Sequence, residues 1–126
     1  MAETDDVVAY LHHWRAPEMG IKVPDGIPVL DNTCPSFEEA IRFIARGRTV
    51  VSNSYHGVYW ALLLGKRVLC IPFSNKFKKF RIAPGYSTAA DWQRDLAKAR
   101  GSDEMLGLCR DATTRFKGQV DALIAR

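Results

Sequence analysis

The chain has 126 residues, of which 47% are hydrophobic and 25% charged, and its net charge is +4. This length and composition suit a single globular domain over residues 1–126 with one real core. The charge is too small and too dispersed for a typical nucleic-acid binder, but it suits a small anionic ligand.

Cysteine usage and the apolar runs bear on the compartment. The three cysteines, Cys34, Cys70 and Cys109, are odd in number and widely spaced, which argues against a disulfide framework or a zinc site. The acidic start does not resemble a secretory signal, and the longest apolar run, Val58–Leu64, is far below the ~20 residues that span a bilayer. We therefore expect a cytoplasmic protein without a membrane span.

The first half of the chain predicts two strands and a loop. Residues 1–5 are expected to be frayed, and the apolar run Val7–Leu11 predicts a buried strand that ends at His12 to Arg15. Residues 16–26 hold two prolines and two glycines, which indicates a loop with a distorted helical turn. Residues 27–30 predict a short strand, and Pro28 favours an edge position for it.

The rest of the chain alternates helices with strands. Ser36 is expected to cap a helix that Gly47 ends, because Glu39 follows three residues later as in a capping box. A strand at 49–52, an apolar helix from about 56 to 64 and a strand at 67–72 follow. Residues 91–100 and 102–125 are predicted to form two closing helices, the last with an apolar stripe.

This order predicts an α/β fold, a Rossmann-like three-layer domain with a parallel sheet of about four strands. In such sheets ligands bind beyond the carboxyl ends of the strands. Four loops should therefore share one edge of the sheet, namely 12–15, 31–33, 52–57 and 73–76.

The most informative of these loops is 52–57, Ser-Asn-Ser-Tyr-His-Gly. A helix that begins near His56 has unpaired N–H groups and a positive dipole end, which suit a phosphate or carboxylate. Ser52, Asn53 and Ser54 add hydrogen-bonding side chains, Gly57 permits close approach, and His56 can transfer a proton. A plain N-cap at Ser54 and a packing role for His56 explain the turn equally well.

Two further cations lie at the same predicted edge. Lys76 is the first of four cations in residues 76–81, and Arg15 could reach an anion across the mouth, although a surface salt bridge explains Arg15 as well. Phe77 and Phe80 also fit a single-strand nucleic-acid surface, but the cluster is short and isolated, so no nucleic-acid partner is expected. His12 and His13 lack spaced partner ligands, so no metal site is expected. The chain has no GxGxxG, Walker or GxSxG motif.

Residues 50–57 (VVSNSYHG), followed by 61–68 (ALLLGKRV), resemble the core signature of the polysaccharide pyruvyltransferase family. Members carry a Ser/Thr-x-Ser-aromatic-His-Gly or Ser-x-Arg-x-His-Gly turn, then a small-residue helix, a Gly-Lys-Pro-like turn and a strand. Arg67 stands where proline is common, and Ser54 where one branch has arginine. Lys76 matches a basic position after the last strand. The resemblance covers about residues 49–77.

The resemblance implies an enzyme of exopolysaccharide or cell-wall polysaccharide biosynthesis. It would transfer a pyruvyl group from phosphoenolpyruvate, its donor substrate, to a sugar as a ketal, without a further cofactor. His56 would be the catalytic acid/base or donor-binding residue. Ser52, Asn53, Ser54, Gly57, Lys76 and Arg15 would shape the anion pocket.

Members of this family are similar to GT-B enzymes and are two to three times longer, and this chain matches their C-terminal half. We therefore expect an N-terminal half or a homo-oligomeric partner to complete the site, and little activity from the chain alone. Two alternatives stay open: the donor-binding half of a nucleotide-sugar glycosyltransferase, and a non-catalytic α/β interaction module.

Overall fold

A computed structural model of the chain describes residues 3–34, 36–78, 80 and 83–101. The predicted helix over 102–125 lies outside these residues. The described part is an α/β fold built on one five-stranded, all-parallel sheet, which is consistent with a Rossmann-like domain.

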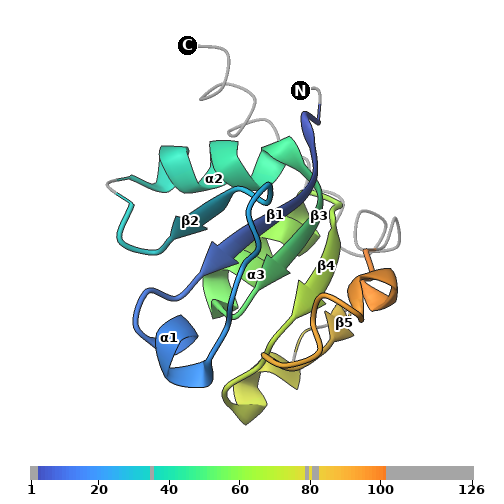
Figure 1. Cartoon of the computed structure of the whole chain (residues 1–126). Coiled ribbons are helices and arrows are strands. Elements are labelled where there is room, and N and C mark those ends of the chain that lie inside the picture. Colours follow the sequence, from blue (N-terminus) through green and yellow to red (C-terminus); the bar gives the residue numbers. More distant parts are fainter. Residues whose placement is uncertain (1–2, 35, 79, 81–82, 102–126) are drawn as a thin grey trace.

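The sheet has the spatial order β2-β1-β3-β4-β5 (Figure 1). The strands span Asp5–Leu11 (β1), Val29–Asp31 (β2), Gly47–Ser52 (β3), Arg67–Cys70 (β4) and Gly85–Tyr86 (β5). The predicted edge position of the second strand is confirmed, and Pro28 directly precedes it. The order 2-1-3-4-5 is one of the two common orders of doubly wound sheets.

The three α-helices of the described residues are Arg15–Met19 (α1), Phe37–Arg46 (α2) and Tyr55–Leu63 (α3). The predicted Ser36 cap is confirmed, since its hydroxyl accepts the Glu39 N–H at 3.1 Å. The predicted turn after residue 15 is the short helix α1, which ends at Gly20 with a left-handed φ of 75°.

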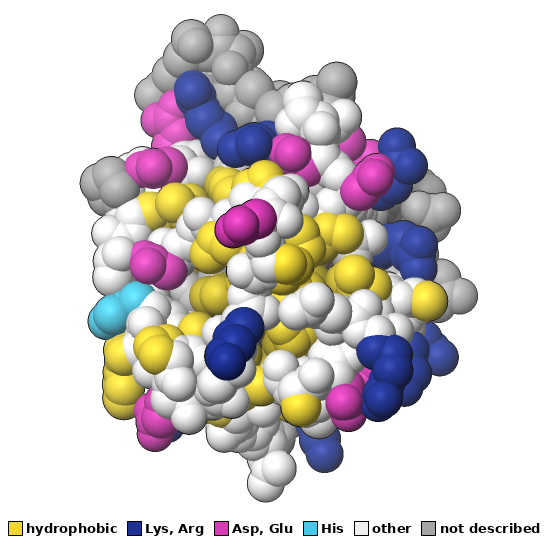
Figure 2. Space-filling view, in the orientation of Figure 1, with side chains coloured by type: hydrophobic (Ala, Val, Ile, Leu, Met, Phe, Trp, Pro, Cys, Tyr) yellow, Lys and Arg dark blue, Asp and Glu magenta, His cyan; other side chains and the backbone are white. Residues whose placement is uncertain are grey.

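Successive side chains of each strand point to opposite faces of the sheet, as the period of two in a β-strand requires, so the core has a part on each face. Side chains at even positions, such as Val8, Val50 and Val68, pack in the cluster that α2 and α3 cover. Their neighbours Ala9, Val51 and Leu69 point to the opposite face, which α1 and the segments 21–27 and 89–99 cover. Figure 2 shows apolar side chains in the middle of that opposite face, over the segments that run in front of the sheet in Figure 1.

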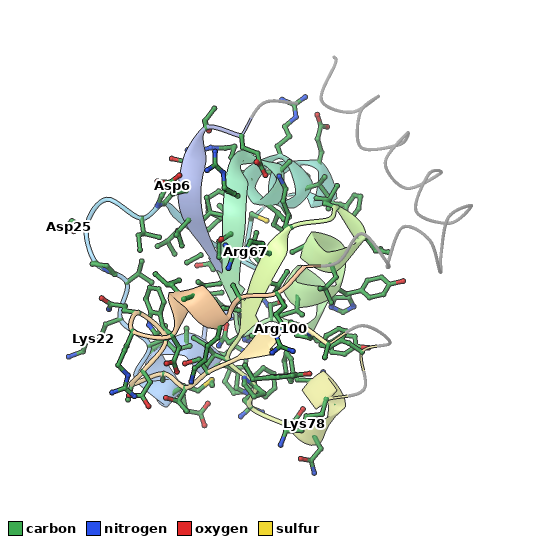
Figure 3. All side chains as sticks on the ribbon, turned by 90° about the vertical axis from the view of Figure 1, so that its right-hand side faces the viewer. Asp6, Lys22, Asp25, Arg67, Lys78 and Arg100 are labelled. Atoms are coloured by element: carbon green, nitrogen blue, oxygen red, sulfur yellow. The ribbon has the colours of Figure 1, made fainter. Side chains whose placement is uncertain are left out.

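The structure corrects the predicted helix over 91–100. Residues 89–95 form turns and only Leu96–Lys98 form a short 3₁₀ helix. Two contacts draw this segment onto the sheet instead: Trp92 is buried against β3 and β4, and Arg100 forms an antiparallel bridge with Val68, alongside β4 (Figure 3).

The fifth strand, β5, is not among the predicted strands. It has two residues and follows Pro84, so its sequence carries a turn signal and no apolar run. Gly85 is required there, because a Cβ would lie 2.0 Å from the backbone oxygen of Lys98. The strand therefore depends on packing against a segment thirteen residues later, which the local pattern does not encode.

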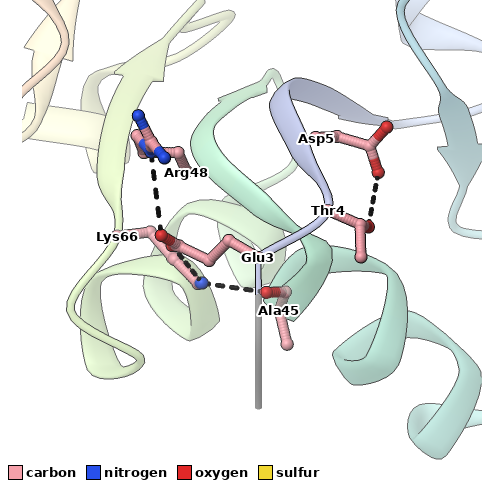
Figure 4. Close-up of polar contacts among 6 residues, drawn as sticks. All are labelled: Glu3, Thr4, Asp5, Ala45, Arg48 and Lys66. Carbon is pink, nitrogen blue, oxygen red and sulfur yellow. Dashed lines mark hydrogen bonds and ion pairs between the residues drawn. The ribbon is translucent and has the colours of Figure 1, made fainter.

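The start of the chain also differs from the expectation of fraying. Asp5 already pairs with Gly47 as part of β1, and the Thr4 N–H donates to the Arg46 carbonyl at 3.0 Å. Lys66 donates to Glu3 Oε2 at 2.7 Å and to the Ala45 carbonyl at 2.9 Å (Figure 4). Residues 3–5 are thus attached to the amino-terminal edge of the sheet by strand pairing and by an ion pair.

Candidate functional site

The strand order reverses between β1 and β3, since β2 lies on one side of β1 and β3 on the other. The chain therefore leaves these two strands in opposite directions, which opens a crevice beyond their carboxyl ends. A cavity of about 500 Å³ lies at this point. Its lining residues come from the predicted edge loops and the start of α3: Tyr10, His12, Trp14, Arg15, Asn32, Ser54, Tyr55, His56, Trp60, Phe73 and Lys76.

The charge of the cavity has one sign. Arg15 and Lys76 line it together with two histidines, and its described lining contains no carboxylate. In the described part of the chain, Arg15 forms an ion pair with Glu18, whose carboxylate is 3.7 Å from the guanidinium and more than half exposed. An exposed pair of this kind is worth little, so the cavity keeps a positive potential.

Aromatic rings hold the two cations in place. The Arg15 guanidinium carbon lies 4.7 Å from the Trp14 ring centre and 4.9 Å from that of Phe73. The Lys76 ammonium lies 5.2 Å from the Tyr55 ring centre and 5.8 Å from that of Phe73. Ring faces attract cations without neutralising them. Both charges are therefore oriented and still available to an anion.

Four of the residues predicted from the sequence meet at this cavity: Arg15, Ser54, His56 and Lys76. The other three, Ser52, Asn53 and Gly57, do not line it, because they are buried beneath it. The cavity also includes residues that the sequence argument did not select, chiefly His12, Trp14, Phe73 and Asn32. These residues follow the predicted strands closely in the sequence. This position could have identified them as cavity residues, since the carboxyl ends of parallel strands all lie at one edge of the sheet.

The buried serines of the turn form hydrogen bonds within the turn and with the first turn of α3. Ser52 Oγ accepts the Ser54 N–H at 3.0 Å, and Ser54 Oγ accepts the Gly57 N–H at 3.3 Å, which caps α3. The capping role of Ser54 is thus present in addition to its place in the cavity wall. Ser52 shapes the turn from below, because its hydroxyl is engaged within the turn.

Asn53 connects the two strands at the switch point. Its Oδ1 accepts the backbone N–H of His12 at 2.7 Å, and its Nδ2 lies 3.5 Å from the Met19 sulfur. The side chain is fully buried. A buried amide with both ends engaged fixes the end of β1 relative to the end of β3, which sets the floor of the cavity.

Gly57 is required by packing rather than by a ligand. A Cβ at this position would lie 2.5 Å from Tyr10 Cδ1 and 2.8 Å from Ser52 Oγ. The missing side chain lets the first turn of α3 lie directly on the β1 strand.

Burial is the main factor that raises the pKa of Tyr10, so its hydroxyl stays neutral in the wall of the cavity.

The two cavity histidines differ in environment. His56 is exposed at the mouth, with its ring 5.6 Å from that of Trp60 and 5.9 Å from that of Tyr55. His12 is half-buried, and burial, followed by the charges of His13, Arg15 and Lys76, lowers its pKa. The apolar helix predicted from about 56 to 64 is not buried on every side, because both His56 and Tyr59 are exposed.

Comparison of the chain with protein-family models, with curated proteins and with solved structures gave no match. Within the described residues, no cluster of three or more His, Cys, Asp or Glu side chains could hold a metal ion. In the same part of the chain, no helix is long and apolar enough to cross a membrane. The fold and the cavity define an α/β protein with a cationic, aromatic-lined crevice at its switch point.

Proposed function

We propose that this cavity binds phosphoenolpyruvate and that the chain is the donor-binding, GT-B-like half of a pyruvyltransferase of polysaccharide biosynthesis in the cytoplasm. The observation that carries the proposal is a cavity with two ring-held cations and two histidines, and with no carboxylate in its described lining. Phosphoenolpyruvate carries a phosphate and a carboxylate on a three-carbon unit. Arg15 and Lys76 would each take one of these two anionic groups.

The size and position of the cavity support a small ligand. A volume of about 500 Å³ lies within the range of small-molecule sites. The sequence resemblance of residues 49–77 covers the turn that carries Ser54 and His56, the helix α3 and Lys76. These are residues that also line the cavity, so the two arguments meet on the same side chains.

The reaction requires two proton transfers and one departing phosphate. An acceptor hydroxyl oxygen bonds to C2 of the enol, the methylene carbon C3 gains a proton, and the C2–oxygen bond to phosphate breaks with its electron pair on the phosphate. A second hydroxyl oxygen then takes the place of the phosphate and closes the ketal. The two hydroxyl protons balance the new C3–H bond and the proton on the released phosphate.

The chain's own residues would divide this work by position. The cations would stabilise the charge that grows on the phosphate as the C2–oxygen bond breaks. His56 stands exposed at the mouth, where an acceptor sugar would arrive, and an imidazole there can accept or return a hydroxyl proton. The second wall of the site would come from an N-terminal half or from another copy of the chain.

The test is a titration of the isotope-labelled chain with phosphoenolpyruvate, followed by amide and side-chain NMR shifts. We expect the shifts to cluster on residues 12–15, 54–56 and 73–76, and to weaken in Lys76→Ala. Lys78→Ala is the matched control, because Lys78 is exposed on the same 3₁₀ helix, Asn75–Lys78, and does not line the cavity (Figure 3).

Two outcomes would replace the proposal. Tight binding of uridine diphosphate without any response to phosphoenolpyruvate would favour a nucleotide-sugar glycosyltransferase half. Self-association in sedimentation experiments, with no NMR shift from either ligand, would favour a non-catalytic interaction module. The ligand concentration for this test is about 10 mM, roughly ten times the upper end of typical KM values of ~1 mM.

A further inference from the structure

The cavity floor contains a histidine with an unusual environment. His12 is the first residue after β1, and its backbone N–H is held by Asn53 at 2.7 Å. Its ring lies parallel to that of His13 with centres 5.5 Å apart, and edge-on to the rings of Trp14 and Phe73 at 5.5 and 5.9 Å. The ring is thus fixed in position by packing on three sides.

Hydrogen bonding does not satisfy this ring. Its Nδ1 is buried and has no hydrogen-bond partner among the described residues. Because the ring lines the cavity, Nε2 is the nitrogen left to meet a ligand. A charged imidazolium carries an N–H on both nitrogens, so it leaves the Nδ1–H without an acceptor, and this cost opposes the charged form whether the cavity is empty or filled.

The charged groups that face His12 all oppose a positive charge on it. They are His13 on the same segment, Arg15 on α1 and Lys76 on the 3₁₀ helix. The described lining offers no carboxylate that would offset them. Burial adds to their effect, and together these lower the pKa of His12 below its ordinary value. With the cavity empty, these neighbours therefore favour the neutral form of His12.

A bound dianion would change this balance. It would neutralise Arg15 and Lys76 and would place negative charge beside the ring itself. An opposite charge within about 4–6 Å moves a pKa by about 1–3 in favour of the charged form. The ligand would therefore replace the carboxylate that the cavity lacks.

We propose that His12 is the third anion-binding side chain of the cavity and that it takes up a proton from solvent as the anion binds. The inference rests on the anion-binding part of the proposed function, and it concerns any small dianion rather than phosphoenolpyruvate alone. The linkage is reciprocal: protonation of His12 strengthens anion binding, and the anion strengthens protonation. A phosphate that leaves during the reaction would then find a protonated donor beside it.

The probe for this test is sulfate, whose charge is constant between about pH 5 and 9, together with phosphoenolpyruvate. We expect wild-type affinity for sulfate to rise about 3- to 10-fold from pH 8 to pH 5.5. This is the change for a pKa that moves by about one, the lower end of the range for a neighbouring opposite charge (tenfold per 1.4 kcal/mol). This rise should persist in His13→Gln and should disappear in His12→Gln. His13→Gln is the control for a histidine outside the cavity lining. Because His13 stacks on His12 and its charge lowers the pKa of His12, the rise should remain in this variant with its midpoint at a higher pH.

A second measurement does not depend on the variant. NMR titration of the His12 ring resonances in the wild-type chain should show a midpoint that moves to higher pH when sulfate is added. A midpoint that does not move, a pH dependence unchanged in His12→Gln, or no sulfate binding at all would overturn the inference. If sulfate gives the His12-dependent rise and phosphoenolpyruvate does not bind, this inference stands and the proposed function fails.

Discussion

The two edges of the sheet differ in how closely acids pair with their cations. At the amino-terminal edge the cations are paired with acids: Lys66 with Glu3 at 2.7 Å, and Arg46 with Asp5 at 3.1 Å. At the carboxyl edge, Arg15 and Lys76 lie over aromatic rings, and Arg15 has only an exposed acid, Glu18, at 3.7 Å. A cation that is closely paired with an acid serves to attach the chain, whereas a cation that lies over aromatic rings keeps its charge for a ligand.

The strongest test of this comparison removes the two ring-held cations. In Arg15→Ala/Lys76→Ala we expect affinity for phosphoenolpyruvate to fall by about 100-fold or more, because each charge-assisted hydrogen bond contributes about 1.5–3 kcal/mol. Calorimetric or NMR titration measures the loss. The same double variant should unfold at nearly the wild-type urea concentration, and a large loss of stability would show that these cations are structural.

The packing beneath the cavity is tested at Gly57. In Gly57→Ala the new Cβ would lie 2.5 Å from Tyr10 Cδ1 and 2.8 Å from Ser52 Oγ, so we expect stability to fall by about 1–3 kcal/mol through overpacking. Urea unfolding measures this fall. An unchanged unfolding midpoint would mean that α3 can move away from β1, and that the glycine is not needed for their close contact.

The attachment at the opposite edge is tested at Lys66, whose side chain is only 11% exposed. We expect Lys66→Met to lower stability by about 1–3 kcal/mol, because the Ala45 carbonyl and Glu3 lose their partner. Ligand affinity should not change. Arg48→Met is the matched control: Arg48 is 68% exposed and 3.9 Å from the same carboxylate, so its removal should cost under about 0.5 kcal/mol.

The smallest expected effect is a pH dependence of stability that comes from His12 at the carboxyl edge of the sheet. The pKa of His12 is lower in the folded chain than its ordinary value of 6.5. Below that pH the unfolded chain therefore binds more protons than the folded chain. The stability that neutral His12 contributes is complete above about pH 6.5 and is lost as the pH falls through the pKa of His12 in the folded chain. Urea midpoints at pH 7.5 and 5.5 should differ less in His12→Gln than in the wild-type chain. An equal difference in both would assign the effect elsewhere.

Much of this architecture could be predicted because its signals are local. The apolar runs of β1, β3 and β4 and the Ser36 and Ser54 caps are legible in a few neighbouring residues, and the convergence of strand ends follows from parallel pairing. These features were enough to bring Arg15, Ser54, His56 and Lys76 to one cavity.

The remainder depended on contacts between distant segments. Asn53 is a floor residue because its oxygen meets the His12 N–H across the switch point, 41 residues away along the chain. β5 exists because Gly85 fits against the backbone of Lys98. The environment of His12 likewise depends on Phe73 and Lys76, which reach it from another loop. No periodicity or motif encodes these neighbours.

The Asn53–His12 hydrogen bond has a consequence for the local opening of the chain. The His12 amide lies beyond the end of β1, where exchange with solvent is ordinarily fast, yet it is held at 2.7 Å by a buried side chain. Hydrogen exchange at this amide therefore requires the switch point itself to open. Its exchange rate is a single-proton report on whether the floor of the cavity is assembled, and it can be read before any ligand is known.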